Sequence, residues 1–386
     1  MYRSLPGTPC RQKLGHDAHR QGQRQPMTTI PAVDQIAPLT SDQVVQFKRD
    51  GYLVLPGVLD PERCRSARDK MWETLADGLP RMKRDDPATW GPISDEESER
   101  LAAKRPSGGG EPLLGGKGHR FYIRNGAEQD MLDLSPRALW TIAEQLMGAD
   151  TVVWPEGADE SGMTTGPCLM SDDAVGGLVS HMGDRMGWPE KGTFETEDAL
   201  KLPKNGPVWL NGQGSRGLYC TLPNSPSPGP EYRGSHSDGA CYGRWRLQFA
   251  AYIDDLPPNS GGFTVWPGSH TRIWDEQWEA YKEGEKHTDK HLTDRKAGGY
   301  SDPVIGRIKA DTKPVDTYGP AGSVVLWHTK ILHMAGQNCS DDVIRQATLY
   351  GYLKTQAALS DELALDNAGG DAWRDWSDEL RAASID

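Results

Sequence analysis

The residues from 234 to 239 contain a histidine and an aspartate, His236 and Asp238, that could bind a metal ion together. On an extended strand, side chains two residues apart point to the same face, so an imidazole and a carboxylate at this spacing can converge on one ion. A pair of this kind is common by chance, and an aspartate that orients a surface histidine is its ordinary explanation. The pair indicates a metal site only if the chain also supplies a third ligand.

A third ligand is available in His333, which lies 97 residues after His236 and follows an apolar segment, 322–327, and a short turn. Two histidines and one carboxylate are the ligand set of non-haem Fe(II) oxygenases, and they leave three positions for a chelating 2-oxo acid and O2. The same set of side chains can hold zinc in a hydrolase.

Two other histidines compete with His333 for this role. His270 closes a Pro-Gly-Ser-His turn, where a histidine typically stabilises the loop, and His328 stands before the turn that leads to His333. The spacing from His333 to Arg345, with Asn338 between them, favours His333 as the ligand.

Arg345 follows His333 by 12 residues, at the start of the last expected strand. A guanidinium binds a carboxylate through two parallel hydrogen bonds, so Arg345 could hold the far carboxylate of 2-oxoglutarate while the keto acid end binds the metal. The alternative is a surface arginine that pairs with Asp341 or Asp342.

The composition of the chain limits the kinds of molecule that we expect it to bind. The chain has 386 residues, a net charge of -12 and a mean hydropathy of -0.66. It lacks an apolar run of the ~18 residues that a membrane-spanning helix needs. The negative charge disfavours nucleic acid and anionic membranes. Six cysteines without a CxxC pair indicate reduced thiols in a cytoplasmic protein. We therefore expect a small-molecule substrate, and no motif defines an oligomeric state.

We expect an α+β fold with one domain. Residues 1–40 are predicted to form a disordered extension, and residues 41–386 a single domain with long insertions at about 155–216 and 271–320. Helices are predicted from Ser41, as a capping residue, to near Gly51, and over 61–75 and 136–147, with a long loop over 80–118. Strands are predicted over 52–55, 151–154, 217–222, 246–253, 262–266, 323–327 and 346–353. Helices first and strands later indicate a core that is an antiparallel barrel or sandwich.

Several of these motifs together resemble the phytanoyl-CoA dioxygenase family. The resemblance extends over about residues 41–355 and lies in the following segments: Asp50-Gly51-Tyr52-Leu53-Val54-Leu55-Pro56-Gly57-Val58-Leu59, His236-Ser237-Asp238, Asn259-Ser260-Gly261-Gly262-Phe263-Thr264-Val265-Trp266-Pro267-Gly268-Ser269-His270, Gly322-Ser323-Val324-Val325-Leu326-Trp327, and His333 with Asn338 and Arg345. It implies a double-stranded β-helix, the jelly-roll or cupin-like barrel, flanked by helices.

The resemblance also implies roles for individual residues. His236, Asp238 and His333 would bind Fe(II), Arg345 would bind 2-oxoglutarate, and Tyr252 stands near a further 2-oxoglutarate contact of the family. Members of the family often have a small polar residue two positions after the distal histidine, where this chain has Ala335. Halogenating relatives replace the carboxylate ligand with a small residue, so Asp238 argues against halogenation.

The resulting hypothesis is a 2-oxoglutarate-dependent dioxygenase that uses Fe(II) and O2 to hydroxylate or otherwise oxidise a small organic molecule, as in secondary metabolism. Family members act on acyl-CoA, amino acids, terpenoids and alkaloids. Trp154, Trp188 and Trp209 are candidates for lining a substrate pocket formed by the insertions. The alternatives are a non-catalytic jelly roll that binds a metal or another ligand, and a zinc hydrolase.

Overall fold

The structure, a computed structural model, describes most of the chain outside its N-terminal extension and its longest insertion. The described residues are 38–103, 113–124, 134, 137–149, 218–229, 232, 234–237, 245–282, 303–353, 371–374 and 376–385. The expected strand at 151–154, the insertion at 155–216 and the three tryptophans within these segments lie outside them, as does nearly all of the extension.

The first elements agree with the sequence analysis. Helix α1 (Ser41–Asp50), strand β1 (Tyr52–Leu55), helix α2 (Pro61–Gly78) and helix α5 (Arg137–Met147) form where they were predicted. The N-cap of α1 is Thr40 rather than Ser41: its side chain accepts a hydrogen bond from the backbone N–H of Gln43, whose own side chain binds back to Thr40. Gly51 ends the helix at φ +79°, which a glycine adopts without strain.

The loop predicted over 80–118 was wrong. The described part of this region contains a short 3-10 helix, η2 (Pro87–Thr89), helix α3 (Asp95–Ala103) and strand β2 (Leu113–Lys117), which pairs with β3 (Arg120–Arg124). Three acidic residues at the start of α3 suit the positive end of the helix dipole. Charged residues and glycines are typical of loops, which is why a loop was predicted. Here the charged residues lie on the exposed surface of a helix and the glycines lie in a hairpin.

Two antiparallel sheets form the core. The major sheet has the strand order β1-β8-β5-β10-β4-β3-β2, and the minor sheet the order β7-β6-β9. The strands not yet given are β4 (Leu218–Thr221), β5 (Trp245–Tyr252), β6 (Phe263–Val265), β7 (Val315–Asp316), β8 (Val324–His328), β9 (His333–Ala335) and β10 (Arg345–Leu353). His236 adds a β-bridge to the free side of β9.

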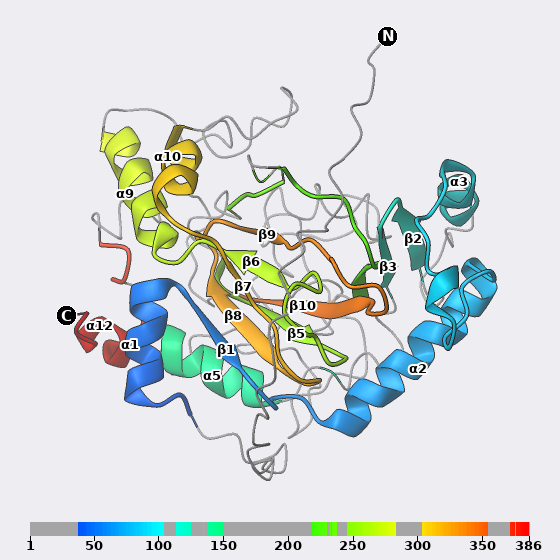
Figure 1. Ribbon diagram of the computed structural model, residues 1–386. Coiled ribbons are helices and arrows are strands. Elements are labelled where there is room, and N and C mark those ends of the chain that lie inside the picture. Colours follow the sequence, from blue (N-terminus) through cyan, green and yellow to red (C-terminus); the bar gives the residue numbers. More distant parts are fainter. Residues whose placement is uncertain are drawn as a thin grey trace, which may run out of the picture.

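The path of the chain between these sheets defines the fold. From β4 the chain goes to His236 in the minor sheet, β5 in the major sheet, β6 and β7 in the minor sheet, and then alternates through β8, β9 and β10. Eight positions divided equally between two facing antiparallel sheets are typical of a jelly roll. The predicted α+β fold with a jelly-roll core is therefore confirmed, and Figure 1 shows its two sheets at the centre of the molecule.

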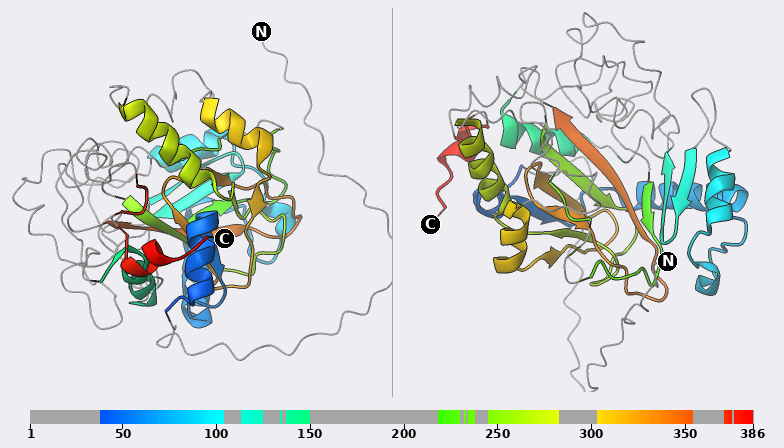
Figure 2. Two further views of the ribbon diagram at one scale, coloured as in Figure 1. Left: turned by 90° about the vertical axis from the view of Figure 1, so that its left-hand side faces the viewer. Right: turned by 90° about the horizontal axis from the view of Figure 1, so that it is seen from above.

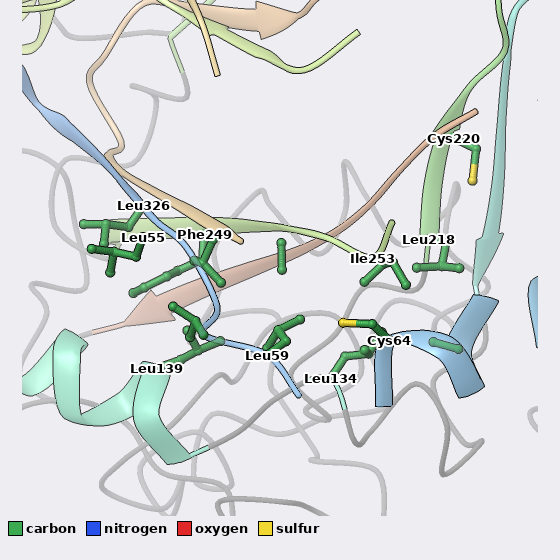
Figure 3. Packing of buried hydrophobic residues seen from close by; sticks show 14 of the residues in the cluster. Leu55, Leu59, Cys64, Leu134, Leu139, Leu218, Cys220, Phe249, Ile253 and Leu326 are labelled. Carbon is green, nitrogen blue, oxygen red and sulfur yellow. The ribbon is translucent and has the colours of Figure 1, made fainter. Parts of the chain in front are cut away.

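Helices cover the outer face of the major sheet. Figure 3 shows Phe249 and Leu326 of the sheet, with Ile253 just after β5, facing Leu139 of α5 and Cys64 of α2. The inner face of the same sheet turns toward the minor sheet, and a second apolar cluster joins Ala250, Tyr252, Val325 and Trp327 to Val265 of β6.

The second predicted insertion, at about 271–320, is partly helical in its described residues. It contains α9 (Ser269–Lys282), α10 (Pro303–Asp311) and β7. Arg272 of α9 pairs with Asp311 of α10 at 2.7 Å, and Figure 2 shows α9 (yellow-green) and α10 (yellow) as neighbours. A last helix, α12 (Asp378–Ala382), packs against α1 and α5. Within the described residues, no helix has the length and apolar character needed to cross a membrane.

Candidate metal and co-substrate site

The register of the major sheet gathers polar side chains on its inner face. Arg120 of β3 and Arg345 of β10 are both paired with Thr221 of β4, and Tyr252 of β5 is paired with Ala347, two residues beyond Arg345. Paired residues of neighbouring strands point to the same face. Because Ala347 and Tyr252 lie in the cluster between the sheets, the two arginines point into the jelly roll as well.

His236 and His333 are brought together by direct backbone pairing. The N–H of His236 donates to the carbonyl of His333 at 2.9 Å, and the N–H of His333 donates to the carbonyl of His236 at 2.8 Å. The centroids of the two rings are 4.4 Å apart. Two residues that are distant in the sequence thus become neighbours with their imidazoles side by side.

The hydrogen bonds of the two rings select one tautomer. Nδ1 of His236 lies 2.9 Å from the carbonyl oxygen of Gly234, and Nδ1 of His333 lies 2.9 Å from that of Ile331. A carbonyl only accepts, so each Nδ1 carries the proton and each neutral ring has its lone pair on Nε2. A metal-binding histidine typically donates its other N–H to a carbonyl or carboxylate in this way.

Aromatic side chains lie against one member of this pair, His333. The ring of Phe263 stacks on His333 with centroids 4.9 Å apart, and the ring centroid of Trp327 lies 4.3 Å from that of Phe263. His333 is only 4% exposed. These side chains therefore keep water away from the His333 side of the pair.

The third predicted ligand, Asp238, lies outside the described residues. Within those residues, no group of three or more histidine, cysteine, aspartate or glutamate side chains could hold a metal ion. The described part of the chain supplies two histidines whose tautomer suits metal binding, His236 and His333, and Asp238 follows His236 by two residues. This donor set fits Fe(II), and the assignment of all three residues as ligands stays a prediction.

The two competing histidines lie in a different environment. His270 and His328 face each other at 5.3 Å in an aromatic cluster with Trp373. Nε2 of His270 lies 3.1 Å from the carbonyl of Lys48, and burial lowers the pKa of His270 to about 4. The backbone of His236 pairs with that of His333 and not with either of these two.

Arg345 is a buried cation. It is 8% exposed, and it donates to the hydroxyl of Thr221 at 2.7 Å and to the carbonyl of Tyr219 at 3.1 Å. Among the described residues its Nε has no hydrogen-bond partner, and burial lowers the pKa of its guanidinium to about 10. The alternative of a surface arginine paired with Asp341 or Asp342 was wrong, because no ion pair joins Arg345 to an acid anywhere in the described segments.

Tyr252 connects the two sheets beside Arg345. Its hydroxyl lies 2.6 Å from the hydroxyl of Thr317 and accepts a hydrogen bond of 2.8 Å from the backbone N–H of Phe263. Burial raises the pKa of Tyr252, which keeps the phenol neutral. The expected contact between Tyr252 and 2-oxoglutarate stays a prediction, and the hydroxyl is already held by these two residues.

Arg120 is a second basic residue of the site, and the sequence analysis missed it. Its guanidinium donates a long hydrogen bond of 3.5 Å to the carbonyl of Ala335, two residues after His333. Its charge also acts on Arg345, whose pKa it helps to lower. Arg120 lies just after the predicted loop of 80–118, in a segment for which no strand was predicted, and no motif links it to the histidines. Recognition of the β2–β3 hairpin would have been the signal.

A comparison with protein families supports the resemblance seen in the sequence. Residues 193–347, about two fifths of the chain, match the model of the family described as phytanoyl-CoA dioxygenase (PhyH). The matched segment contains His236, Asp238, His333 and Arg345, so the predicted resemblance is confirmed for the part of the chain that carries the site. No curated protein sequence matches the chain significantly.

Solved structures resemble the chain only distantly. EctD from S. alaskensis, crystallised with 2-oxoglutarate and 5-hydroxyectoine, has a TM-score of 0.41 at 14% identity, over 82% of this chain and 77% of its own. AviO1 from Streptomyces viridochromogenes Tue57 has a TM-score of 0.39 at 15% identity, over 84% of this chain and 99% of its own. The carbocyclase SnoK of nogalamycin biosynthesis has a TM-score of 0.34 at 15% identity, over 82% and 87%.

Proposed function

We propose that this chain oxidises a C–H bond of a small organic molecule at a site built from His236, Asp238, His333 and Arg345. The chain carries a phytanoyl-CoA dioxygenase domain and is a dioxygenase that depends on iron and 2-oxoglutarate. When bound, iron and 2-oxoglutarate would activate O2 for oxidation of the substrate, with 2-oxoglutarate consumed as the co-substrate and released as succinate and CO2. The residues of the chain bind these groups, orient them and exclude water.

The burial of Arg345 without an acidic partner among the described residues is the observation that carries this proposal. A buried charge is costly unless it is paired, so a site that keeps one open is suited to an anionic ligand. The far carboxylate of 2-oxoglutarate supplies that anion and accepts hydrogen bonds from the guanidinium. Thr221 and Tyr219 hold the guanidinium in place before the ligand arrives.

The remaining residues have supporting roles. His236 and His333 direct Nε2 to the metal because their Nδ1–H groups are held by backbone carbonyls. Arg120 adds positive charge at the same end of the jelly roll as Arg345 and favours a dianionic co-substrate. Phe263 and Trp327 form an apolar wall beside His333, which protects the reacting groups from water.

The proposal is tested by anaerobic titration of the Fe(II)-loaded protein with 2-oxoglutarate, followed by the visible absorption of the chelate. The wild-type chain and Arg374→Gln, a change at an exposed arginine, should bind 2-oxoglutarate equally, whereas Arg345→Gln should bind it much more weakly. Equal binding by all three proteins would contradict the assignment of Arg345.

The reaction class is tested by O2-dependent release of succinate in a screen of small organic molecules. Zn(II)-dependent hydrolysis without O2 consumption would indicate a hydrolase instead. Binding of metal and 2-oxoglutarate without turnover of any kind would indicate a non-catalytic jelly roll.

A further inference from the structure

The turn from 329 to 332 between β8 and β9 is attached to both histidines of the candidate metal site. His328 shapes the start of the turn: its Nδ1 accepts a hydrogen bond of 3.1 Å from the N–H of Lys330, and its carbonyl accepts one of 2.9 Å from the N–H of Ile331. The turn ends at His333. The position of the His333 ring therefore depends on the geometry that His328 imposes a few residues earlier.

Ser237, the residue between His236 and Asp238, attaches the other half of the site to the same turn. Its hydroxyl donates to the carbonyl of Lys330 at 3.0 Å and lies 3.4 Å from that of Thr329, and the side chain is only 2% exposed. Together with the two backbone hydrogen bonds between His236 and His333, this contact fixes both histidines relative to one short turn.

The C-terminal segment covers His328 from outside the turn. Trp376 stacks on the His328 ring with centroids 5.1 Å apart and planes 23° apart, and Trp373 contacts the same ring edge-on at 5.4 Å. Phe47 of α1 contacts both tryptophans and holds them in place. His328 is thereby restrained on its ring face by residues that follow it in the sequence by about fifty positions.

We propose that His328 is a positioning residue that, with Ser237, sets the separation of His236 and His333, and that Trp376 maintains this geometry through His328. This inference rests on the proposed function in one respect, because it takes His236 and His333 as metal ligands. His328 does not bind the metal itself: its Nδ1 accepts from a backbone N–H, and its ring lies between the turn and the C-terminal tryptophans.

The inference predicts that metal affinity depends on residues that do not touch the metal. Residues that orient metal ligands typically change metal affinity by about 10–100-fold when they are replaced. We therefore expect His328→Leu, which keeps the bulk but removes the acceptor, to weaken metal binding by about that factor. His328→Asn keeps an acceptor in a similar position and should restore part of the affinity. Ser237→Ala should act like His328→Leu, and Ser237→Thr should retain the hydrogen bond.

The experiment is a titration of the full chain with Co(II) alone, followed by the visible absorption bands of the bound ion, with a thermal melt of each protein. The control is Leu139→Ala, which removes a buried side chain of α5 on the outer face of the major sheet and should lower the melting temperature without changing Co(II) affinity. Trp376→Phe keeps a stacking ring and should stay close to wild type, whereas Trp376→Ala should weaken Co(II) binding and alter the band positions.

The outcomes are distinct. Weaker Co(II) binding with shifted bands in His328→Leu and Ser237→Ala, and its recovery in His328→Asn and Ser237→Thr, supports the inference. Wild-type Co(II) affinity in folded His328→Leu and Ser237→Ala would overturn it and leave the proposed function intact. Failure of the wild-type chain to bind Co(II) would overturn the metal site and this inference together.

Discussion

The two faces of the major sheet differ sharply although the same strands build both. Outward-facing side chains of β4, β5 and β8, such as Leu218, Phe249 and Leu326, are apolar and buried beneath α1, α2 and α5. Inward-facing side chains include Thr221 and Arg345, which carry the polar contacts of the candidate site. Alternation along a strand thus assigns stability to one face and ligand binding to the other.

This comparison implies that the two properties can be altered separately. A change on the outer face should lower the free energy of unfolding and leave ligand affinity unchanged in the folded fraction. A change on the inner face should do the reverse, since it removes a contact to a ligand and few contacts of the core.

The largest effect is expected from Asp238→Ala, which removes the only anionic member of the proposed ligand set. Succinate release should fall to the background rate, while the melting temperature stays close to that of the wild-type chain. Asp341→Ala, a change at an exposed aspartate, is the matched control and should keep full activity. Normal turnover by Asp238→Ala in the presence of excess Fe(II) would exclude Asp238 as a ligand.

Phe249→Ala tests the outer face. This side chain is fully buried, and a change from phenylalanine to alanine in a core typically costs about 3–5 kcal/mol in the free energy of unfolding. Denaturant unfolding measures that loss. The folded fraction should bind 2-oxoglutarate with wild-type affinity, and a large loss of affinity would show that the two faces are not independent.

Arg345→Ala tests the inner face. Removing one partner of a buried pair of charges typically costs about 2–5 kcal/mol, which corresponds to a loss of affinity of about 30-fold to several thousand-fold. We expect the requirement for 2-oxoglutarate to rise by a factor in this range, with a much smaller effect on metal binding. Calorimetric titration checks both affinities, and an unchanged affinity for 2-oxoglutarate would require a different anchor.

Acid should destabilise the fold through His270, which is buried against α1 and the C-terminal segment. The pKa of His270 is about 4 in the folded chain and about 6.5 in the unfolded chain, so the unfolded state takes up a proton first. Stability is therefore complete above pH 6.5 and is lost as the pH falls toward 4. Between pH 7.5 and 5 the loss should be about 2 kcal/mol. Denaturant unfolding of wild type and His270→Gln measures it, and an equal pH dependence in both proteins would contradict this origin.

The smallest effect is expected from Arg120→Ala. Arg120 is exposed, so water screens its charge, and we expect the affinity for 2-oxoglutarate to fall by no more than about tenfold. Lys117→Ala on the same hairpin is the control, because Lys117 pairs with Asp95 at the surface. A loss as large as that of Arg345→Ala would mean that Arg120 is the main anchor of the co-substrate.

Local signals in the sequence predicted the strands of an antiparallel barrel or sandwich. The jelly roll was implied by the resemblance to the phytanoyl-CoA dioxygenase family, and the association of His236 with His333 was expected from the ligand set that they would form. Short alternating apolar segments indicate strands, and a histidine at the end of such a segment lies at the edge of the core. The same signals delimited α1, α2 and α5 closely. These elements bury one face, and the resulting apolar periodicity is visible in the sequence.

Other parts of the fold could not be predicted, because they depend on tertiary contacts. Strands β7 and β9 have only two and three residues, too few for any alternation to be visible, and each is defined by its pairing with β6. Arg120 becomes part of the site only when β3 pairs with β4. No property of Arg120 in the sequence distinguishes it from the other basic residues of the chain.

The pairing of His236 with His333 also has a consequence for how the protein folds. Because this contact closes a loop of nearly a hundred residues, forming it costs conformational entropy, and long-range contacts of this kind form slowly. An ion that needs both imidazoles has no comparable site in the unfolded chain. By mass action, it stabilises the folded state in proportion to the logarithm of its free concentration. The availability of metal in the cell would then influence how much of this protein survives, in addition to how much of it is active.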